Sequence, residues 1–213
     1  MSQIVIVDAG IGNLRSVQKG FEHVGATPTI TDDPAVVTEA DAVVLPGVGA
    51  FGDGMDGLRS RGLDRAVFES IERGVPLFGI CVGLQLLFEE SEEMGTHCGL
   101  GVLPGKIARF PTHLTVPHMG WNQIEQRGSH PLLIGVPEGA FTYFAHSYHV
   151  VTDDESIVVA TTDYGGPFAS VVARDNVWAI QFHPEKSQQV GLRVLQNFVE
   201  RITKGFDNSF DLG

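Results

Sequence analysis

Short apolar runs alternate with amphipathic segments along the first half of the chain. Residues 4–7, 42–45 and 75–78 are continuously apolar, as strands buried on both faces of a parallel sheet are. A segment with apolar residues at helical spacing follows each run; the first of these helices has Asn13 as a good N-cap and ends at Gly25. The helical apolar residues are Leu14, Val17, Phe21 and Val24, then Leu58, Val67 and Ile71, and then Leu84, Leu87 and Phe88. The alternation predicts strand–helix units around a mostly parallel sheet.

From about residue 99 the pattern changes to short strand-like runs separated by Pro and Gly. The runs 106–110, 141–150 and 156–161 predict antiparallel sheet. A hairpin is predicted for residues 169–182, and a last helix for residues 188–203. The apolar face of that helix comprises Leu192, Leu195, Phe198, Val199 and Ile202, and residues 206–213 are expected to fray. We therefore expect a three-layer α/β fold with a central mixed, mostly parallel sheet, flanking helices and an added antiparallel sheet.

Composition narrows the class of protein. A chain of 213 residues with 43% hydrophobic residues is predicted to form one domain over residues 1–213. The net charge of −12, with only 14 Lys and Arg, argues against a nucleic-acid partner. The first apolar run meets Asp8 after four residues, so it is neither a signal peptide nor a membrane span. Two cysteines do not make a disulfide framework, and we expect a cytoplasmic protein with no membrane partner.

Candidate chemistry begins at residues 79–85, Gly-Ile-Cys-Val-Gly-Leu-Gln, which join the third apolar run to its helix. A nucleophile on a tight strand-to-helix elbow needs glycine two residues before and after it, as Gly79 and Gly83 are to Cys81. The helix N-terminus favours thiolate over thiol at this position, and the N–H of Val82 can donate to an oxyanion. Gln85 follows one turn later and can reach a substrate over the thiol. The alternative is a buried structural cysteine in a chain that has 26 glycines.

A candidate base follows the last predicted strand, in His183-Pro184-Glu185. The imidazole of His183 can act as general base, and the carboxylate of Glu185 can orient it and stabilise the imidazolium. Nucleophile, base and orienter would then all lie at strand ends.

A second oxyanion donor is expected from the loop 46–52, which also follows a predicted strand. Glycines, Gly47 and Gly49, flank Val48 on both sides, which makes the peptide that enters Val48 easy to rotate, so its N–H can turn toward the same oxyanion as that of Val82. The alternative is an ordinary turn between a strand and a helix.

Cofactor and metal sites are not indicated. Gly10-Ile11-Gly12 suggests a dinucleotide fingerprint, but its third glycine and acidic residue are not convincingly placed. Cys81 and His183 lack the paired ligand spacing of a zinc site. We expect no cofactor and no metal.

The elbow and the His-Pro-Glu string together resemble the class I (triad) glutamine amidotransferases. Four strings, at residues 46–51, 117–122, 143–148 and 181–187, are similar to the glutaminase subunits of imidazole glycerol phosphate synthase, and the resemblance runs from residue 4 to about 198. Glutaminase subunits of pyridoxal phosphate synthase are similar in size but carry a Pro-Gly-Gly-Glu-like loop that this chain lacks. The chain departs from the usual family residues at Val82, Leu84, Ala145 and His149, none of which belongs to the triad.

This resemblance implies hydrolysis of L-glutamine to glutamate and ammonia through a γ-glutamyl thioester on Cys81. It implies a heterodimer with a (βα)8-barrel cyclase subunit, which uses the ammonia to form imidazole glycerol phosphate and aminoimidazole carboxamide ribotide in histidine biosynthesis. The glutamine-binding residues implied are His146, Ser147 and Tyr148, and the residues implied at the partner interface are Asn13, Trp121, Tyr143 and Lys186. The rival interpretations are another triad cysteine hydrolase, such as a γ-glutamyl hydrolase or a peptidase-like relative, and an inactive scaffold.

Overall fold

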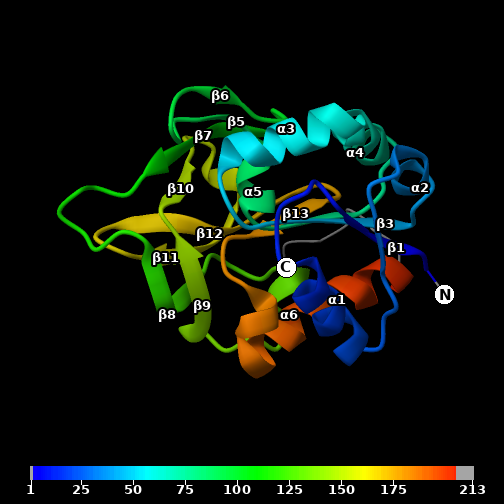
Figure 1. Ribbon diagram of the computed structural model, residues 1–213. Helices are drawn as coiled ribbons and strands as arrows, with labels where there is room; N and C mark the ends of the chain where they lie inside the picture. Colours follow the sequence, from blue (N-terminus) through cyan, green and yellow to red (C-terminus); the bar gives the residue numbers. More distant parts are fainter. Residues whose placement is uncertain (1, 205–213) are drawn as a thin grey trace.

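The computed structural model describes residues 2–204, so the fraying expected for residues 206–213 lies outside the described part of the chain. Figure 1 shows a sheet between two layers of helices. Helices α1 (Leu14–His23) and α6 (Gln188–Lys204) cover one face. The other face carries α2 (Pro34–Thr38), α3 (Phe51–Arg61), α4 (Leu63–Glu72) and α5 (Val82–Leu86). The three-layer α/β prediction is confirmed.

Five parallel strands form one half of the sheet, in the order β2-β1-β3-β4-β13. They are β2 (Thr29–Thr31), β1 (Ile4–Val7), β3 (Ala42–Gly47), β4 (Leu77–Cys81) and β13 (Val177–Ile180). Every residue of β1, β3, β4 and β13 is buried, which is why these strands have continuous apolar or small-residue sequences.

The remaining strands extend this sheet beyond β13, mostly in antiparallel pairs. They are β12 (Pro167–Arg174), β10 (Tyr148–Val151), β7 (Leu103–Arg109), β5 (Phe88–Ser91) and β6 (His97–Cys98). A branch from β12 runs through β11 (Val158–Asp163) to β8 (His118–Gln126) and β9 (Ala140–His146). Thus the added antiparallel strands are continuous with the parallel half, and β5 is parallel to its neighbour β7. Short 3-10 turns are η1 (Pro131–Leu133), η2 (Glu155–Ile157) and η3 (Pro184–Lys186).

Two helix predictions are wrong in extent. The segment that carries Leu58, Val67 and Ile71 is divided between α3 and α4, because Gly62 adopts a left-handed φ of 70° that no continuous helix allows. The helix after Cys81 ends at Leu86, and Phe88 begins β5. Leu84, Leu87 and Phe88 are all fully buried, and a short segment that is buried all round shows no reliable period.

Smaller differences concern the ends of elements. The run 141–150 breaks at Ser147 into β9 and β10, which pair with different strands. Asn13 precedes α1 as expected, but its side chain makes no capping hydrogen bond. On α6, Val194 is fully buried although it was not predicted on the apolar face, whereas Leu192, which was predicted there, is only half-buried. Within residues 2–204 no helix has the length and apolar character needed to cross a membrane.

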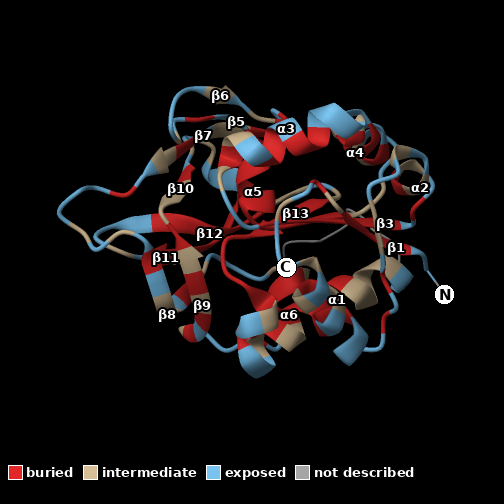
Figure 2. Cartoon of the chain, in the orientation of Figure 1, coloured by how far each residue is buried: buried red, intermediate tan, exposed pale blue. Residues whose placement is uncertain are grey.

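The hydrophobic core lies where the sheet meets its two helical layers (Figure 2). Phe198 of α6 stacks on Phe78 of β4 with ring centroids 4.8 Å apart, and Phe21 of α1 meets it edge-on. This packing holds α1 and α6 against β4, which lies between β3 and β13.

The carboxyl ends of β3, β4 and β13 lie side by side. The strand register pairs Gly47 with Cys81 and Ile80 with Ile180. Because parallel strands end at the same edge of a sheet, the loop after β3, the elbow after β4 and the segment after β13 emerge together. This edge is the place where a site can form.

Candidate active site

Cys81 lies on a strained turn between β4 and α5. Its φ is +56° and its ψ is −110°, a conformation that L-residues other than glycine rarely adopt. The residue is 2% exposed and ends β4, which lies between β3 and β13 in the sheet. The predicted elbow geometry is therefore present, although α5 has only five residues.

The two elbow glycines are required by close packing. A Cβ on Gly83 would lie 1.7 Å from the carbonyl oxygen of Leu45 in β3, far inside van der Waals contact distance. A Cβ on Gly79 would lie 3.0 Å from the Cβ of Ala179 in β13. The elbow thus fits between its neighbouring strands only without side chains at these two positions.

We expect Gly83→Ala to lower the free energy of unfolding by at least about 3 kcal/mol, because backbone must move to admit the methyl group. Gly25→Ala is the matched control, since Gly25 has a φ of +86° but no atom within 4 Å of an added Cβ. Its cost should be limited to the left-handed backbone strain of about 1–2 kcal/mol. Urea denaturation measures both variants, and an equal loss for the two would contradict the packing argument.

His183 and Glu185 form a buried pair directly after β13. Nδ1 of His183 lies 3.0 Å from Oε1 of Glu185, and both side chains are 4% exposed. Burial alone lowers the pKa of His183, but its hydrogen bonds and charge interactions with Cys81 and Glu185 outweigh burial and raise the pKa to about 10. With Nδ1 facing the carboxylate, Nε2 is left for the thiol. The three residues predicted as nucleophile, base and orienter are therefore brought together.

Ser187 ties the His183 segment to β9. Its hydroxyl donates to the carbonyl of His183 at 2.6 Å and accepts the N–H of Tyr143 at 2.9 Å. The N–H of His183 in turn donates to the carbonyl of Tyr143 at 2.9 Å. The sequence places Ser187 in a family-like string but carries no signal for this bracing role.

The loop after β3 lies against the elbow, as predicted. Val48 and Gly49 line the same cavity as Cys81 and Val82, and a Cβ on Gly47 would lie 2.8 Å from the Cβ of Val82. Gly12 packs on this loop, since a Cβ added to Gly12 would lie 3.5 Å from the backbone nitrogen of Val48. Gly12 belongs to the turn that was considered as a dinucleotide fingerprint.

A cavity of about 160 Å³ opens over the Cys81 side of the elbow. Gln85 and the predicted glutamine-binding residues His146, Ser147 and Tyr148 all line it. Glu93 also lines it and is the one carboxylate among the described lining residues. Oε2 of Glu93 accepts the N–H of Phe51, the first residue of α3, at 2.7 Å. The sequence analysis missed Glu93, which stands in an acidic run that is typical of a solvated surface.

Gln85 supports the cavity wall. Its side chain is 3% exposed, and its Nε2 donates to the carbonyl of Tyr148 at 2.9 Å and to Oε1 of Gln181 at 3.1 Å. Gln181, which the sequence analysis gave no role, also directs its Nε2 at the sulfur of Cys81 at 3.8 Å. The two amides connect the thiol to the turn at Tyr148.

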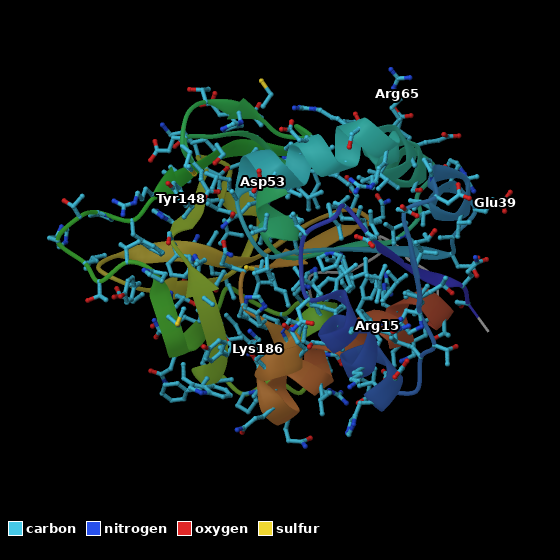
Figure 3. All side chains as sticks on the ribbon, viewed as in Figure 1. Arg15, Glu39, Asp53, Arg65, Tyr148 and Lys186 are labelled. Atoms are coloured by element: carbon cyan, nitrogen blue, oxygen red, sulfur yellow. The ribbon has the colours of Figure 1, made fainter. Side chains whose placement is uncertain are left out.

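Three of the four predicted interface residues form a cluster beside the site. Trp121 meets Tyr143 edge-on with ring centroids 6.0 Å apart, and Nζ of Lys186 lies 5.6 Å from the centroid of Tyr143. Asn13 is exposed at the start of α1 and takes no part in these contacts. Figure 3 labels Lys186 and Tyr148; Lys186 lies in η3, which follows β13, and Tyr148 is the first residue of β10.

Cys81 is buried, Cys98 is exposed, and both are free thiols. Within residues 2–204 no three His, Cys, Asp or Glu side chains are grouped so that they could hold a metal ion.

Comparison with known proteins agrees with this geometry. The family model described as glutamine amidotransferase class-I matches residues 5–202. A protein of Syntrophotalea carbinolica named imidazole glycerol phosphate synthase subunit HisH is 57% identical, and the match covers 92% of this chain and 98% of that protein. A protein of the same name from Salinibacter ruber is 56% identical, over 91% of this chain and 92% of that protein.

Solved structures show the same fold at low sequence identity. A structure titled as a glutamine amidotransferase superposes with a TM-score of 0.74 at 22% identity, covering 93% of this chain and 98% of the other. A chain of PurLQS from Thermotoga maritima superposes with a TM-score of 0.74 at 19% identity, covering 94% of this chain and 99% of the other.

Proposed function

The chain belongs to the class-I glutamine amidotransferase family, and we propose that it is the glutaminase subunit of an imidazole glycerol phosphate synthase. It hydrolyses L-glutamine, and the ammonia passes to a (βα)8-barrel cyclase subunit that forms imidazole glycerol phosphate and aminoimidazole carboxamide ribotide in histidine biosynthesis. The observation that carries the proposal is the strained Cys81 elbow beside the buried His183–Glu185 pair. The proposal includes a single glutaminase domain, supported by the match over residues 5–202, and a cytoplasmic location, supported by two free thiols.

The reaction proceeds by acyl transfer through the thiol. The thiol proton of Cys81 passes to Nε2 of His183, and the sulfur attacks the γ-carbonyl carbon of glutamine. The N–H groups of Val82 and Val48 bind the carbonyl oxygen as it becomes negative. His183 then gives its proton to the amide nitrogen, which leaves as ammonia, and the γ-glutamyl thioester remains on Cys81. His183 next takes a proton from the water that attacks the thioester, and glutamate is released. Glu185 holds the ring of His183 in place throughout and stabilises its positive charge whenever the ring is protonated.

The cavity offers matching groups for the rest of the substrate. A glutamine whose γ-carbonyl lies at Cys81 extends its ammonium and carboxylate toward the cavity walls. The carboxylate of Glu93 suits the ammonium, because a charge-assisted hydrogen bond is stronger than a neutral one. The turn at Ser147 and Tyr148, held by Gln85, suits the substrate carboxylate through its backbone.

An exposed apolar face on β8 and β9 is evidence for a protein partner. Strand alternation turns Met119 and Trp121 of β8 outward, and they are 65% and 46% exposed. Phe141 of β9 is 54% exposed on the same face, because β8 and β9 pair Gln123 with Phe141 and Trp121 with Tyr143. Apolar groups gathered in this way mark interaction surfaces. Since Met119 also lines the cavity, we propose that the cyclase docks here, over Trp121, Tyr143, Lys186 and Asn13, and receives ammonia directly.

A diazoketone analogue of L-glutamine tests this function. In the presence of the cyclase we expect one adduct, on Cys81, and protection by excess L-glutamine. Cys98 is the internal control, since this exposed thiol should react with iodoacetamide but not with the analogue. Absence of a Cys81 adduct would contradict the proposal. Faster hydrolysis of γ-glutamyl peptides than of glutamine would favour the rival hydrolase.

Steady-state hydrolysis of glutamine by the complex with the cyclase tests the role of Glu93. Glu93→Gln keeps an acceptor for the N–H of Phe51 but removes the charge, so KM for glutamine should rise about 10- to 100-fold. Glu90→Gln, on an exposed neighbouring residue, should leave KM unchanged.

A further inference from the structure

Two buried histidines face each other across the β8–β9 pair, outside the triad. The register places His118 directly opposite His146, and they are 4% and 6% exposed. Nδ1 of His118 lies 3.1 Å from Nε2 of His146. Neither imidazole has a role in the acyl-transfer chemistry derived above.

When both imidazoles are neutral, the hydrogen bonds of this pair can run in only one direction. Nδ1 of His146 lies 2.8 Å from the carbonyl oxygen of Tyr148, which only accepts, so this nitrogen carries the proton. Nε2 of His146 is then an acceptor and takes the proton of His118 Nδ1. Nε2 of His118 is in turn an acceptor, and it takes an N–H of Asn122 at 3.2 Å. The second N–H of Asn122 donates to the carbonyl of Asp163 at 2.9 Å.

Both imidazoles must be neutral for this arrangement, because an imidazolium has no acceptor nitrogen. Burial lowers the pKa of His118 to about 4 and that of His146 to about 3, so both are neutral near pH 7. Stacked rings fix the plane of His118, with Tyr164 at 4.0 Å and Phe144 at 4.9 Å between ring centroids.

The hydrogen bonds that run from Asn122 through His118 to His146 form a relay. This relay ends on the turn at Ser147 and Tyr148, which lines the cavity. The carbonyl of Tyr148 receives two donors, Nδ1 of His146 and Nε2 of Gln85. Both ring nitrogens of His146 are used inside the protein, so its imidazole has no unengaged nitrogen to offer the substrate. We propose that Asn122, His118 and His146 are positioning residues, whose relay holds the Ser147–Tyr148 turn in the geometry that binds glutamine.

This inference rests on the proposed glutaminase function, so the wild-type complex with the cyclase is assayed first. An inactive wild-type complex would refute the function itself. Given activity, His118→Phe keeps an aromatic ring between Tyr164 and Phe144 but removes both nitrogens, which leaves His146 Nε2 and an Asn122 N–H unpaired. We expect KM for glutamine to rise about tenfold with kcat within about twofold.

Two further variants distinguish an effect on glutamine binding from a general loss of protein stability. His118→Asn retains an N–H close to the position of Nδ1, so it should bring KM back to within about threefold of wild type. Phe168→Leu is the control, since Phe168 packs on both imidazoles without a hydrogen bond to them. It should lower the melting temperature and leave KM unchanged. A normal KM in His118→Phe, or an equal rise in Phe168→Leu, would overturn the inference.

A measurement on the wild-type protein covers the case in which His118→Phe fails to fold. Long-range ¹⁵N–¹H correlation spectra of protein labelled with ¹⁵N-histidine report the protonated ring nitrogen. We expect His118 and His146 both as neutral rings with the proton on Nδ1. A proton on Nε2 of either ring, or an imidazolium, would refute the relay.

Discussion

Replacing Cys81 with Ala is expected to stop glutamine-dependent synthesis by the assembled complex while synthesis from added ammonia continues within a few fold of the wild-type rate. The reason is that the thiol only liberates ammonia, and the cyclase can use ammonia from solution. In a comparable triad, removal of the nucleophile or of the base costs on the order of 10⁶ in kcat, so the loss should be at least about 10⁴-fold. The measurement is the rate of product formation with glutamine and with an ammonium salt.

His183→Ala should behave in the same way, since without His183 no group near Cys81 delivers a proton to the leaving nitrogen. Glu185→Gln should keep roughly 10²-fold more activity than either, because an orienting residue costs less to lose than the nucleophile or base. Cys98→Ala is the matched control, and both activities should be unchanged, because this thiol is exposed and outside the cavity. Loss of the ammonia-dependent reaction by more than a few fold in Cys81→Ala or His183→Ala would show that the assigned roles are wrong.

The isolated chain is expected to be nearly inactive and to gain about 10²–10³ in turnover when the cyclase binds, the amount associated with one oxyanion-hole donor. The donor in question is the N–H of Val48. Gly47 is packed against Val82, whereas Gly49 has a φ of +118° and no atom within 4 Å of a Cβ position. The peptide entering Val48 is therefore anchored on one side and free to turn on the other.

The surface proposed for the cyclase is hydrogen-bonded to the segment that carries His183. Tyr143 belongs to the exposed cluster with Trp121 and Lys186, and its backbone exchanges hydrogen bonds with His183 and Ser187. Val48, at 47% exposure, lies at the mouth of the same cavity. A partner that contacts this face can therefore bias both the base and the oxyanion loop. The alternative is a polar and aromatic rim without coupling to the site.

Glutaminase turnover of the chain alone, with the cyclase, and with the cyclase plus its nucleotide ligand distinguishes these possibilities. Full activity of the isolated chain would contradict the prediction that the cyclase activates it. Gly49→Pro provides a second test, because proline fixes φ near −65° and cannot adopt the loop conformation of Gly49. A Gly49→Pro variant that binds cyclase and glutamine normally and still shows undiminished stimulation would also contradict it. Gly128→Pro, at another positive φ in an open position, controls for the change in backbone φ.

Local sequence was sufficient for the continuously apolar strands β1, β3 and β4 and for placing Cys81, His183 and Glu185 at strand ends, whereas β2, which is not fully buried, was not predicted. Strands buried on both faces must be continuously apolar, and a nucleophile elbow crowded by β3 and β13 must have glycine at positions 79 and 83. Each of these requirements acts within a few residues, so each leaves a readable pattern. The hairpin of β12 and β13, which delivers His183, is likewise local, with Arg174 paired to Val177.

Only the tertiary structure decided where the buried helices end and which residues support the site around Cys81, His183 and Glu185. Leu84, Leu87 and Phe88 are buried by different neighbours, so their spacing did not reveal that a helix ends at Leu86 and a strand begins at Phe88. Glu93 becomes a cavity residue through the position of α3, and His118 becomes the partner of His146 through the β8–β9 register, 28 residues away in sequence. The reason is physical: a hydrogen-bond partner that comes from a distant strand is set by sheet pairing, which no local period encodes.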